Sequence, residues 1–159
     1  MKRNVLFAIS SAILLALLVG QRLASGQATN AEGPSRAAIL AVLTAQQESW
    51  NHGDIEGFMN GYWNSPQLTF SGAGGLRRGW EPVRADYRTR YHDAQAMGHL
   101  DFSELEVYAL GKDAALVLGR WHLQRASDEL GGVFTLVFHW FPEGWRIIHD
   151  HTSADAKPH

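Results

Sequence analysis

The sequence predicts an α+β fold, in which a cone-like, curved antiparallel sheet wraps around three N-terminal helices. The first observation behind this prediction is a change of period. Apolar residues recur at helical spacing up to about residue 91, and from Leu100 onward they alternate with polar residues. The second observation is that short turns rich in glycine divide this alternating part into four segments, as in an antiparallel meander.

The first two expected helices are joined by a Gly-Asp pair. Ser35 can cap the first helix, whose apolar stripe ends at Trp50. Gly53 is suited to end this helix, and Asp54 can cap the second, which Pro66 stops. The pair therefore predicts two consecutive helices with a tight joint between them.

The rest of the domain alternates between one more helix and several strands. A short strand is expected at Leu68–Ser71, followed by a glycine-rich loop at Gly72–Gly75 and a helix that begins near Trp80. The four strands of the meander are expected at Phe102–Leu110, Ala114–Gln124, Gly132–Phe141 and Trp145–Ser153. The two middle strands are apolar on both faces, which predicts that a second copy covers the outer face as a homodimer.

The N-terminus has the order of a secretory signal peptide. Lys2 and Arg3 precede an uncharged apolar run at Val5–Gly20, and small residues follow at Leu23–Ala28. The run is shorter than the roughly 20 residues that span a bilayer, although an uncleaved anchor is the alternative. We expect a signal peptide at 1–26, a flexible lead-in at 27–34, the domain at 35–153 and a frayed tail at 154–159. The protein is then exported, to the periplasm or outside the cell, with no membrane attachment after cleavage.

Composition narrows the class of function. The 159 residues predict one domain, and removal of residues 1–26 takes the formal charge from −2 to −5 because it removes three cations and no acid. An acidic domain argues against a nucleic-acid partner. The absence of cysteine excludes a disulfide scaffold, a thiolate metal site and a cysteine nucleophile.

Three segments resemble the nuclear transport factor 2-like superfamily, which includes ketosteroid isomerases and SnoaL-type cyclases. They are the helix joint Trp50–Glu56, the third-helix start Gly79-Trp80, and the closing strand Gly144–Ser153. The resemblance covers about residues 36–153 and is closest to exported bacterial members of unassigned function. It implies the fold and not one activity, because this fold hosts enzymes, binding domains and assembly modules.

The resemblance also implies where isomerase chemistry would lie. Counting from the shared motifs puts Gln46, Phe70 and Leu136 at the positions where ketosteroid isomerases have their tyrosine and two aspartates. These residues supply neither a base nor an oxyanion donor of that kind. We therefore do not expect ketosteroid isomerase activity, and whether the protein is an enzyme stays open.

Strand alternation predicts an aromatic pocket with a polar end. His149, His151 and Ser153 are expected to face inward on the last strand, and Arg120 and His122 share a face on the strand two before it. The histidines are the tentative acid–base pair. The expected ligand contacts are Arg120, His122, Gln46, Trp50, Trp63, Phe70, Trp80, Tyr87, Leu136 and Phe138.

The expected ligand is a small, partly apolar compound with an anionic or carbonyl group, because arginine offers a planar fork of donors. No cofactor and no metal site are predicted; the sharpest alternative is a metal held by His149, His151 and His122. Asp150 has the opposite parity to the histidines and is expected to face away, but would become a candidate base if it faced inward. The alternatives to ligand binding are an enzyme of the SnoaL or isomerase type that uses a pocket histidine, and an oligomeric assembly module.

Overall fold

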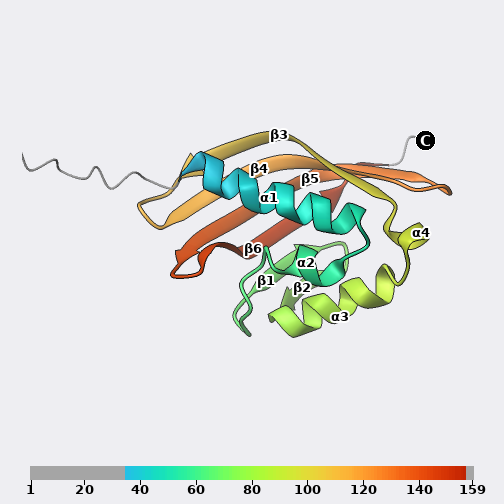
Figure 1. Ribbon diagram of the computed structural model, residues 1–159, viewed down its shortest axis with the longest axis horizontal. Helices are drawn as coiled ribbons and strands as arrows, with labels where there is room; N and C mark the ends of the chain where they lie inside the picture. The colour runs from blue at the N-terminus through green and yellow to red at the C-terminus, as the bar shows by residue number, and fades with distance from the viewer. Residues whose placement is uncertain (1–34, 157–159) are drawn as a thin grey trace, which may run out of the picture. The chain divides into compact units, whose positions relative to one another are not determined.

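A computed structural model describes residues 35–156, and Figure 1 shows the arrangement of its elements. In chain order these are α1 (Arg36–Asn51), α2 (Ile55–Met59), β1 (Thr69–Gly72), β2 (Gly75–Arg78), α3 (Trp80–Arg90), α4 (Ala94–Met97), β3 (His99–Ala109), β4 (Ala114–Gln124), β5 (Glu129–Phe141) and β6 (Gly144–Ala154). The expected signal peptide at 1–26 and lead-in at 27–34 lie outside the described residues. Across residues 35–156 no helix has both the length and the apolar character to cross a membrane.

The sheet confirms the α+β prediction, but it is mixed and not wholly antiparallel. Its six strands run in the order β2-β1-β6-β5-β4-β3, and β3 to β6 form the expected antiparallel meander. β1 pairs with β6 in parallel, which was not predicted from the sequence. Most of the chain lies between these two strands, so no tight turn forces them to be antiparallel.

The glycine-rich segment is a hairpin and not the expected loop. Gly72 pairs with Gly75, so only Ala73 and Gly74 form the turn between β1 and β2. Gly75 has a φ of +83°, a conformation that glycine adopts without steric cost. The hairpin lies at the edge of the sheet beside α3 (Figure 1).

The helix joint forms as the sequence predicts. The Ser35 hydroxyl accepts a hydrogen bond from the Ala38 amide at the start of α1, and Asp54 accepts one from Gly57 at the start of α2. α2 nevertheless ends at Met59, before the predicted stop, because the next residues join β6 instead. The Trp63 amide donates to the Ile147 carbonyl oxygen at 2.9 Å.

Two bulges set the faces of the long strands. In β6, Ile147 pairs with Phe138 but His149 pairs with Val137, which leaves Ile148 as an extra residue. In β3 the register shifts between Ser103 and Glu106. Each extra residue exchanges the inward and outward faces of the strand that follows it.

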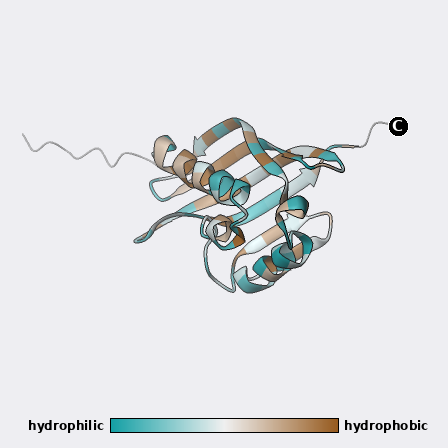
Figure 2. Ribbon diagram, turned by 45° about the vertical axis from the view of Figure 1, so that its right-hand side comes forward, coloured by the Kyte–Doolittle hydropathy of each residue, from teal (hydrophilic) through white to brown (hydrophobic). Residues whose placement is uncertain are grey.

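The core lies between α1, α2 and α3 on one side and the inner face of the sheet on the other. Its largest fully buried apolar side chains are Phe138, Ile39, Leu43, Met59, Leu68, Ile147 and Val117. Figure 2 shows that α3 is mostly hydrophilic, so it contributes little to this core. On the outer face Val133 is 45% exposed, and the homodimer that would cover this face stays a prediction.

Candidate functional site

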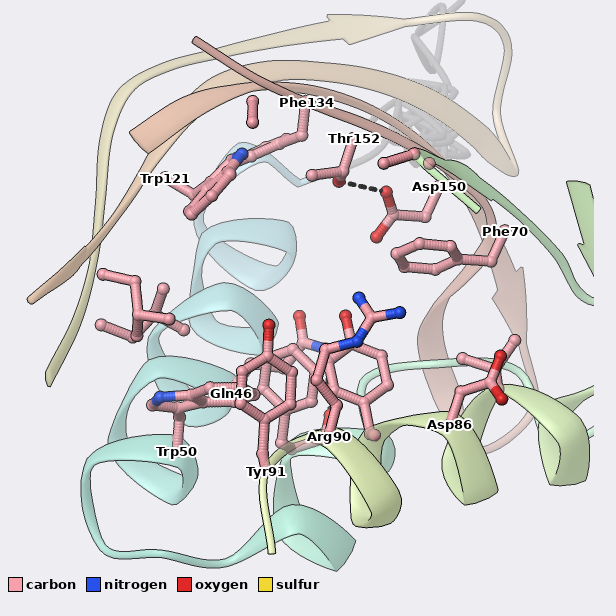
Figure 3. Close-up of a pocket in the computed structure, with 18 of the residues that line it drawn as sticks. Gln46, Trp50, Phe70, Asp86, Arg90, Tyr91, Trp121, Phe134, Asp150 and Thr152 are labelled. Carbon is pink, nitrogen blue, oxygen red and sulfur yellow. Dashed lines mark hydrogen bonds between the residues drawn. The ribbon is translucent and has the colours of Figure 1, made fainter. Parts of the chain in front are cut away.

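A pocket of about 370 Å³ lies between the helices and the inner face of the sheet. Its wall is mostly apolar and rich in aromatic rings, and Figure 3 shows side chains from the strands facing side chains from α1 and from the end of α3. The aromatic lining consists of Trp50, Phe58, Tyr62, Phe70, Tyr87, Tyr91, Phe102, Trp121 and Phe134. A concave, apolar site of this size is suited to a small organic ligand.

A buried carboxylate lies in this apolar wall. Asp150 is 4% exposed, and its two oxygens accept hydrogen bonds from different hydroxyls. The Thr152 hydroxyl donates to Oδ1 at 2.6 Å (Figure 3), and the Tyr62 hydroxyl donates to Oδ2 at 2.8 Å. Each oxygen keeps a second lone pair, so the carboxylate retains capacity to accept a proton or a further hydrogen bond.

Burial raises the pKa of the Asp150 carboxyl to about 6, while the hydrogen bonds from Thr152 and Tyr62 and the charge of His151 act in the opposite direction. At neutral pH the group is therefore mostly ionised, with about a tenth of it protonated. A carboxyl poised in this way can both take and return a proton.

Two tyrosine hydroxyls near Asp150 stay protonated. Burial, and then the charge of Asp150, raise the pKa of Tyr62 well above its ordinary value. The same two causes, in the same order, raise the pKa of Tyr87. Both hydroxyls are thus hydrogen-bond donors at any physiological pH.

The inward face predicted for the last strand is wrong after its bulge. Ile148 is the extra residue, so Asp150 and Thr152 line the pocket while His149, His151 and Ser153 lie on the outer side. His151 and Ser153 are exposed, and His149 contacts the Thr69 hydroxyl through Nδ1 at 2.7 Å. Burial, and then the charge of His151, lower the pKa of His149. Neither histidine reaches the pocket as a tentative acid–base residue would.

Arg120 and His122 also lie on the outer face, contrary to the prediction. On β4 the buried positions are Ala115, Val117, Gly119 and Leu123, so the alternate positions face outward. Arg120 forms an ion pair with Asp155 at 2.6 Å, and His122 contacts Glu129 at 2.7 Å. The apolar run of β4 allowed either face to be buried, and the predicted face is the wrong one.

The remaining predicted ligand contacts divide into two groups. Gln46, Trp50, Phe70, Tyr87 and Leu136 line the pocket as expected. Phe138, Trp63 and Trp80 do not line it.

Each of these three side chains packs elsewhere. Phe138 is fully buried in the core, and Trp63 stacks on Phe141 with ring centroids 5.2 Å apart. The Trp80 indole donates to the Met59 carbonyl oxygen at 3.0 Å. These aromatic residues therefore hold the core and the end of the sheet together.

The positions counted from the isomerase pattern do face the pocket, although their residues differ. The Gln46 amide donates to the Phe58 carbonyl oxygen at 3.0 Å, which commits it to holding α1 against α2. Phe70 and Leu136 add apolar wall. The carboxylate of the pocket is instead that of Asp150, which lies on β6, whereas Gln46, Phe70 and Leu136 lie on other elements.

Several pocket residues were missed by sequence reasoning. Tyr62 follows the end of α2 and Thr152 follows the bulge of β6, so neither was expected in the pocket. Arg90 and Tyr91, at the end of α3, also line the pocket. The i, i+3, i+4, i+7 spacing of Val83, Asp86, Tyr87 and Arg90 is the signal that would have revealed this pocket-facing stripe. Among residues 35–156 no group of three histidine or acidic side chains is placed to hold a metal ion.

Comparison with known proteins supports the fold and the family. Residues 39–157 match the model of the SnoaL-like domain. A crystal structure of an NTF2-like protein of unknown function from Shewanella oneidensis is 39% identical, with a TM-score of 0.71; the match covers 74% of this chain and 97% of that one.

More distant structures share the fold alone. An NTF2-like protein of unknown function from Pseudomonas putida is 19% identical, with a TM-score of 0.65 and coverage of 76% of this chain and 87% of that one. An NTF2-like superfamily protein from Salmonella enterica is 22% identical, with a TM-score of 0.60 and coverage of 76% and 91%. No curated protein is a significant match to this chain.

Proposed function

We propose that this chain, which belongs to the SnoaL-like domain family, binds a small, partly apolar carbonyl compound and transfers a proton to or from it with Asp150. The observation that carries the proposal is a single buried carboxylate in an aromatic pocket, with a pKa near 6. Carboxyls placed in apolar surroundings are a common source of general acids and bases.

The wall of the pocket favours a flat, apolar ligand body. Rings from both layers surround the space, with Phe70 and Trp121 on the strand side and Trp50 and Tyr91 on the helix side (Figure 3). Aromatic side chains of this kind bind a ring system through its faces and edges. A ligand that covers these rings would displace water from them, which would strengthen each polar interaction beside it.

The proposed proton transfer uses two groups of the chain. The ionised Asp150 carboxylate removes a proton from the carbon next to the ligand carbonyl, and the carbonyl oxygen takes up the negative charge as an enolate. The Tyr87 hydroxyl lines the pocket and stays protonated, so it can donate a hydrogen bond to that oxygen. If the Asp150 carboxyl first trades its proton with solvent and then protonates the same carbon, the net reaction is an exchange. If a carbon–carbon double bond next to that carbon extends the enolate to a dienolate, Asp150 can return the proton to the far end of that double bond, and the net reaction is an isomerisation.

A binding domain without turnover is the second candidate. Its supporting observation is that both oxygens of Asp150 already accept hydrogen bonds, from Tyr62 and Thr152, as in a carboxylate that only holds the wall together. The two candidates differ in whether a bound ketone exchanges its acidic protons. Export also belongs to the proposal, and the signal-like order of residues 1–26 supports it.

The test uses 2-tetralone, a bicyclic ketone with acidic protons beside its carbonyl. We expect the protein to accelerate the exchange of these protons for deuterium in D₂O, followed by proton NMR. Asp150→Asn keeps the shape of the side chain but cannot accept the proton, so it should lower the exchange rate to the buffer rate.

The matched control is His122→Ala, because this histidine lies on the outer face of the sheet, where it contacts Glu129, and is not among the groups that act on the pKa of Asp150. Its exchange rate should equal that of the wild type. If Asp150→Asn still binds 2-tetralone and exchanges it as fast as the wild type, the carboxylate is structural and the proposed reaction is wrong. If the wild type binds the ketone without accelerating exchange, the binding domain is the correct candidate.

A further inference from the structure

We infer that Arg90 is the anion-binding residue of the pocket and that the ligand is a flat monocarboxylate, held by its carboxylate at Arg90 and by its carbonyl or hydroxyl at Asp150. This inference rests on the proposed function, because it assigns the class of ligand to the same pocket. The anionic ligand expected from the sequence depended on Arg120, which lies on the outer face. Arg90 is a different residue on a different element.

Arg90 belongs to the pocket by its place on α3. Val83, Asp86, Tyr87 and Arg90 share one side of this helix, and all four line the pocket. Figure 3 shows the Arg90 guanidinium pointing from the end of α3 into the pocket, on the side opposite the strand that carries Asp150. The two groups therefore face the ligand space from opposite layers.

Three arginines line the pocket, and two of them already have acidic partners. Arg77 pairs with Asp86 at 2.9 Å, and Arg125 makes two hydrogen bonds to Asp128, each at 2.7 Å. Within residues 35–156 no carboxylate lies within ion-pair distance of Arg90. Arg90 is thus the pocket cation that is still able to bind an anion.

The charge of Arg90 acts inside the pocket but does not neutralise Asp150. It lowers the pKa of Tyr87, whereas the groups that act on the pKa of Asp150 are Thr152, Tyr62 and His151. A ligand between Arg90 and Asp150 therefore meets a cation at one end and a proton-exchanging carboxyl at the other. The guanidinium presents a planar fork of donors that fits a carboxylate, and the rings of Tyr87 and Tyr91 beside it suit a flat body.

The experiment compares two fluorescent naphthalenes that differ by one group. 6-Hydroxy-2-naphthoate carries a hydroxyl at one end and a carboxylate at the other, and 2-naphthol lacks the carboxylate. We expect the wild type to bind the naphthoate about tenfold more tightly than the naphthol, which is the size of one charge-assisted hydrogen bond. Arg90→Gln should remove that advantage and leave the affinity for 2-naphthol unchanged.

Arg78→Gln is the matched control. It removes the same charge from the neighbouring β2 strand, where Arg78 is exposed and does not line the pocket. Its affinity for both compounds should equal that of the wild type. Equal losses of naphthoate affinity in Arg90→Gln and Arg78→Gln would show a general effect of charge and would overturn the inference.

Two further outcomes separate the inference from the proposed function. If the wild type binds 2-naphthol as tightly as the naphthoate, the pocket takes flat ligands and only the role of Arg90 is wrong. If the wild type binds neither compound, the proposed function fails for this class of ligand, and the inference fails with it.

Discussion

Replacing Asp150 with asparagine should change how the stability of the protein depends on pH. Burial raises the pKa of this carboxyl from 3.8 to about 6, so the folded state binds its proton more tightly than the unfolded state does. The stabilisation that this proton provides is complete below the unfolded pKa and is lost as the pH rises through about 6. At neutral pH the ionised, buried carboxylate is therefore a net cost to the folded state.

The size of this cost follows from the pKa shift. A shift from 3.8 to about 6 corresponds to about 3 kcal/mol of unfolding free energy well above pH 6. About 1 kcal/mol of it is already lost at about pH 4.5, which leaves about 2 kcal/mol to be lost between about pH 4.5 and pH 7.5. The asparagine side chain of the variant does not ionise, so the variant avoids this loss and should gain about 2 kcal/mol relative to the wild type over that interval.

The assay is urea unfolding of both proteins at the two pH values, followed by tryptophan fluorescence. Changes in the hydrogen bonds from Tyr62 and Thr152 shift the variant by a similar amount at both pH values, so they cancel in the comparison. The titrations of all other groups cancel in the same way. A stability difference between variant and wild type that does not change with pH would refute the raised pKa, and with it the acid–base role.

Three other substitutions test separate parts of the structure. Gly119→Ala should destabilise the protein by about 1–3 kcal/mol in thermal unfolding, since its Cβ would overlap the ring of Phe134 in the pocket wall; an unchanged melting temperature would contradict this packing. Gln46→Leu should lower the unfolding free energy by about 0.5–1.5 kcal/mol in urea, since the buried Phe58 carbonyl loses the amide donor of Gln46 and keeps only the weaker bond from the Gly61 amide, and an equally stable variant would show that this hydrogen bond is replaceable. Val133→Lys should convert a homodimer to a monomer in light scattering without changing the circular dichroism, and a wild type that is already monomeric would contradict the predicted dimer.

The helices and the meander could be predicted from sequence because their signals are local. Ser35 and Asp54 cap helices through hydrogen bonds to residues three positions along, and each can be recognised without knowledge of the fold. The pairing of β1 with β6 could not be found in this way, because it joins residues about 80 positions apart. The sequence of a short strand does not indicate which strand it pairs with, or whether the pairing is parallel or antiparallel.

The inward-facing histidines of the last strand were mispredicted through one residue. Strand alternation is reliable only while the register is unbroken, and Ile148 breaks it. Trp145 and Ile147, before the bulge, face inward as the alternation predicts, whereas His149 and Asp150, after it, exchange faces. The bulge has no sequence signature here, because Ile148 would fit the pleat as well as either of its neighbours.

The place of β6 in the sheet bears on how the domain forms during synthesis. β6 lies between β1 and β5, so it alone links the hairpin of the N-terminal half to the meander of the C-terminal half. Every other strand leaves the ribosome before β6, and none of them can complete the sheet without it. The sheet therefore stays in two separate parts until the last strand emerges, and contacts this distant in sequence form slowly. Since Asp150 lies on that strand, the pocket gains its carboxylate at the same moment as the fold closes.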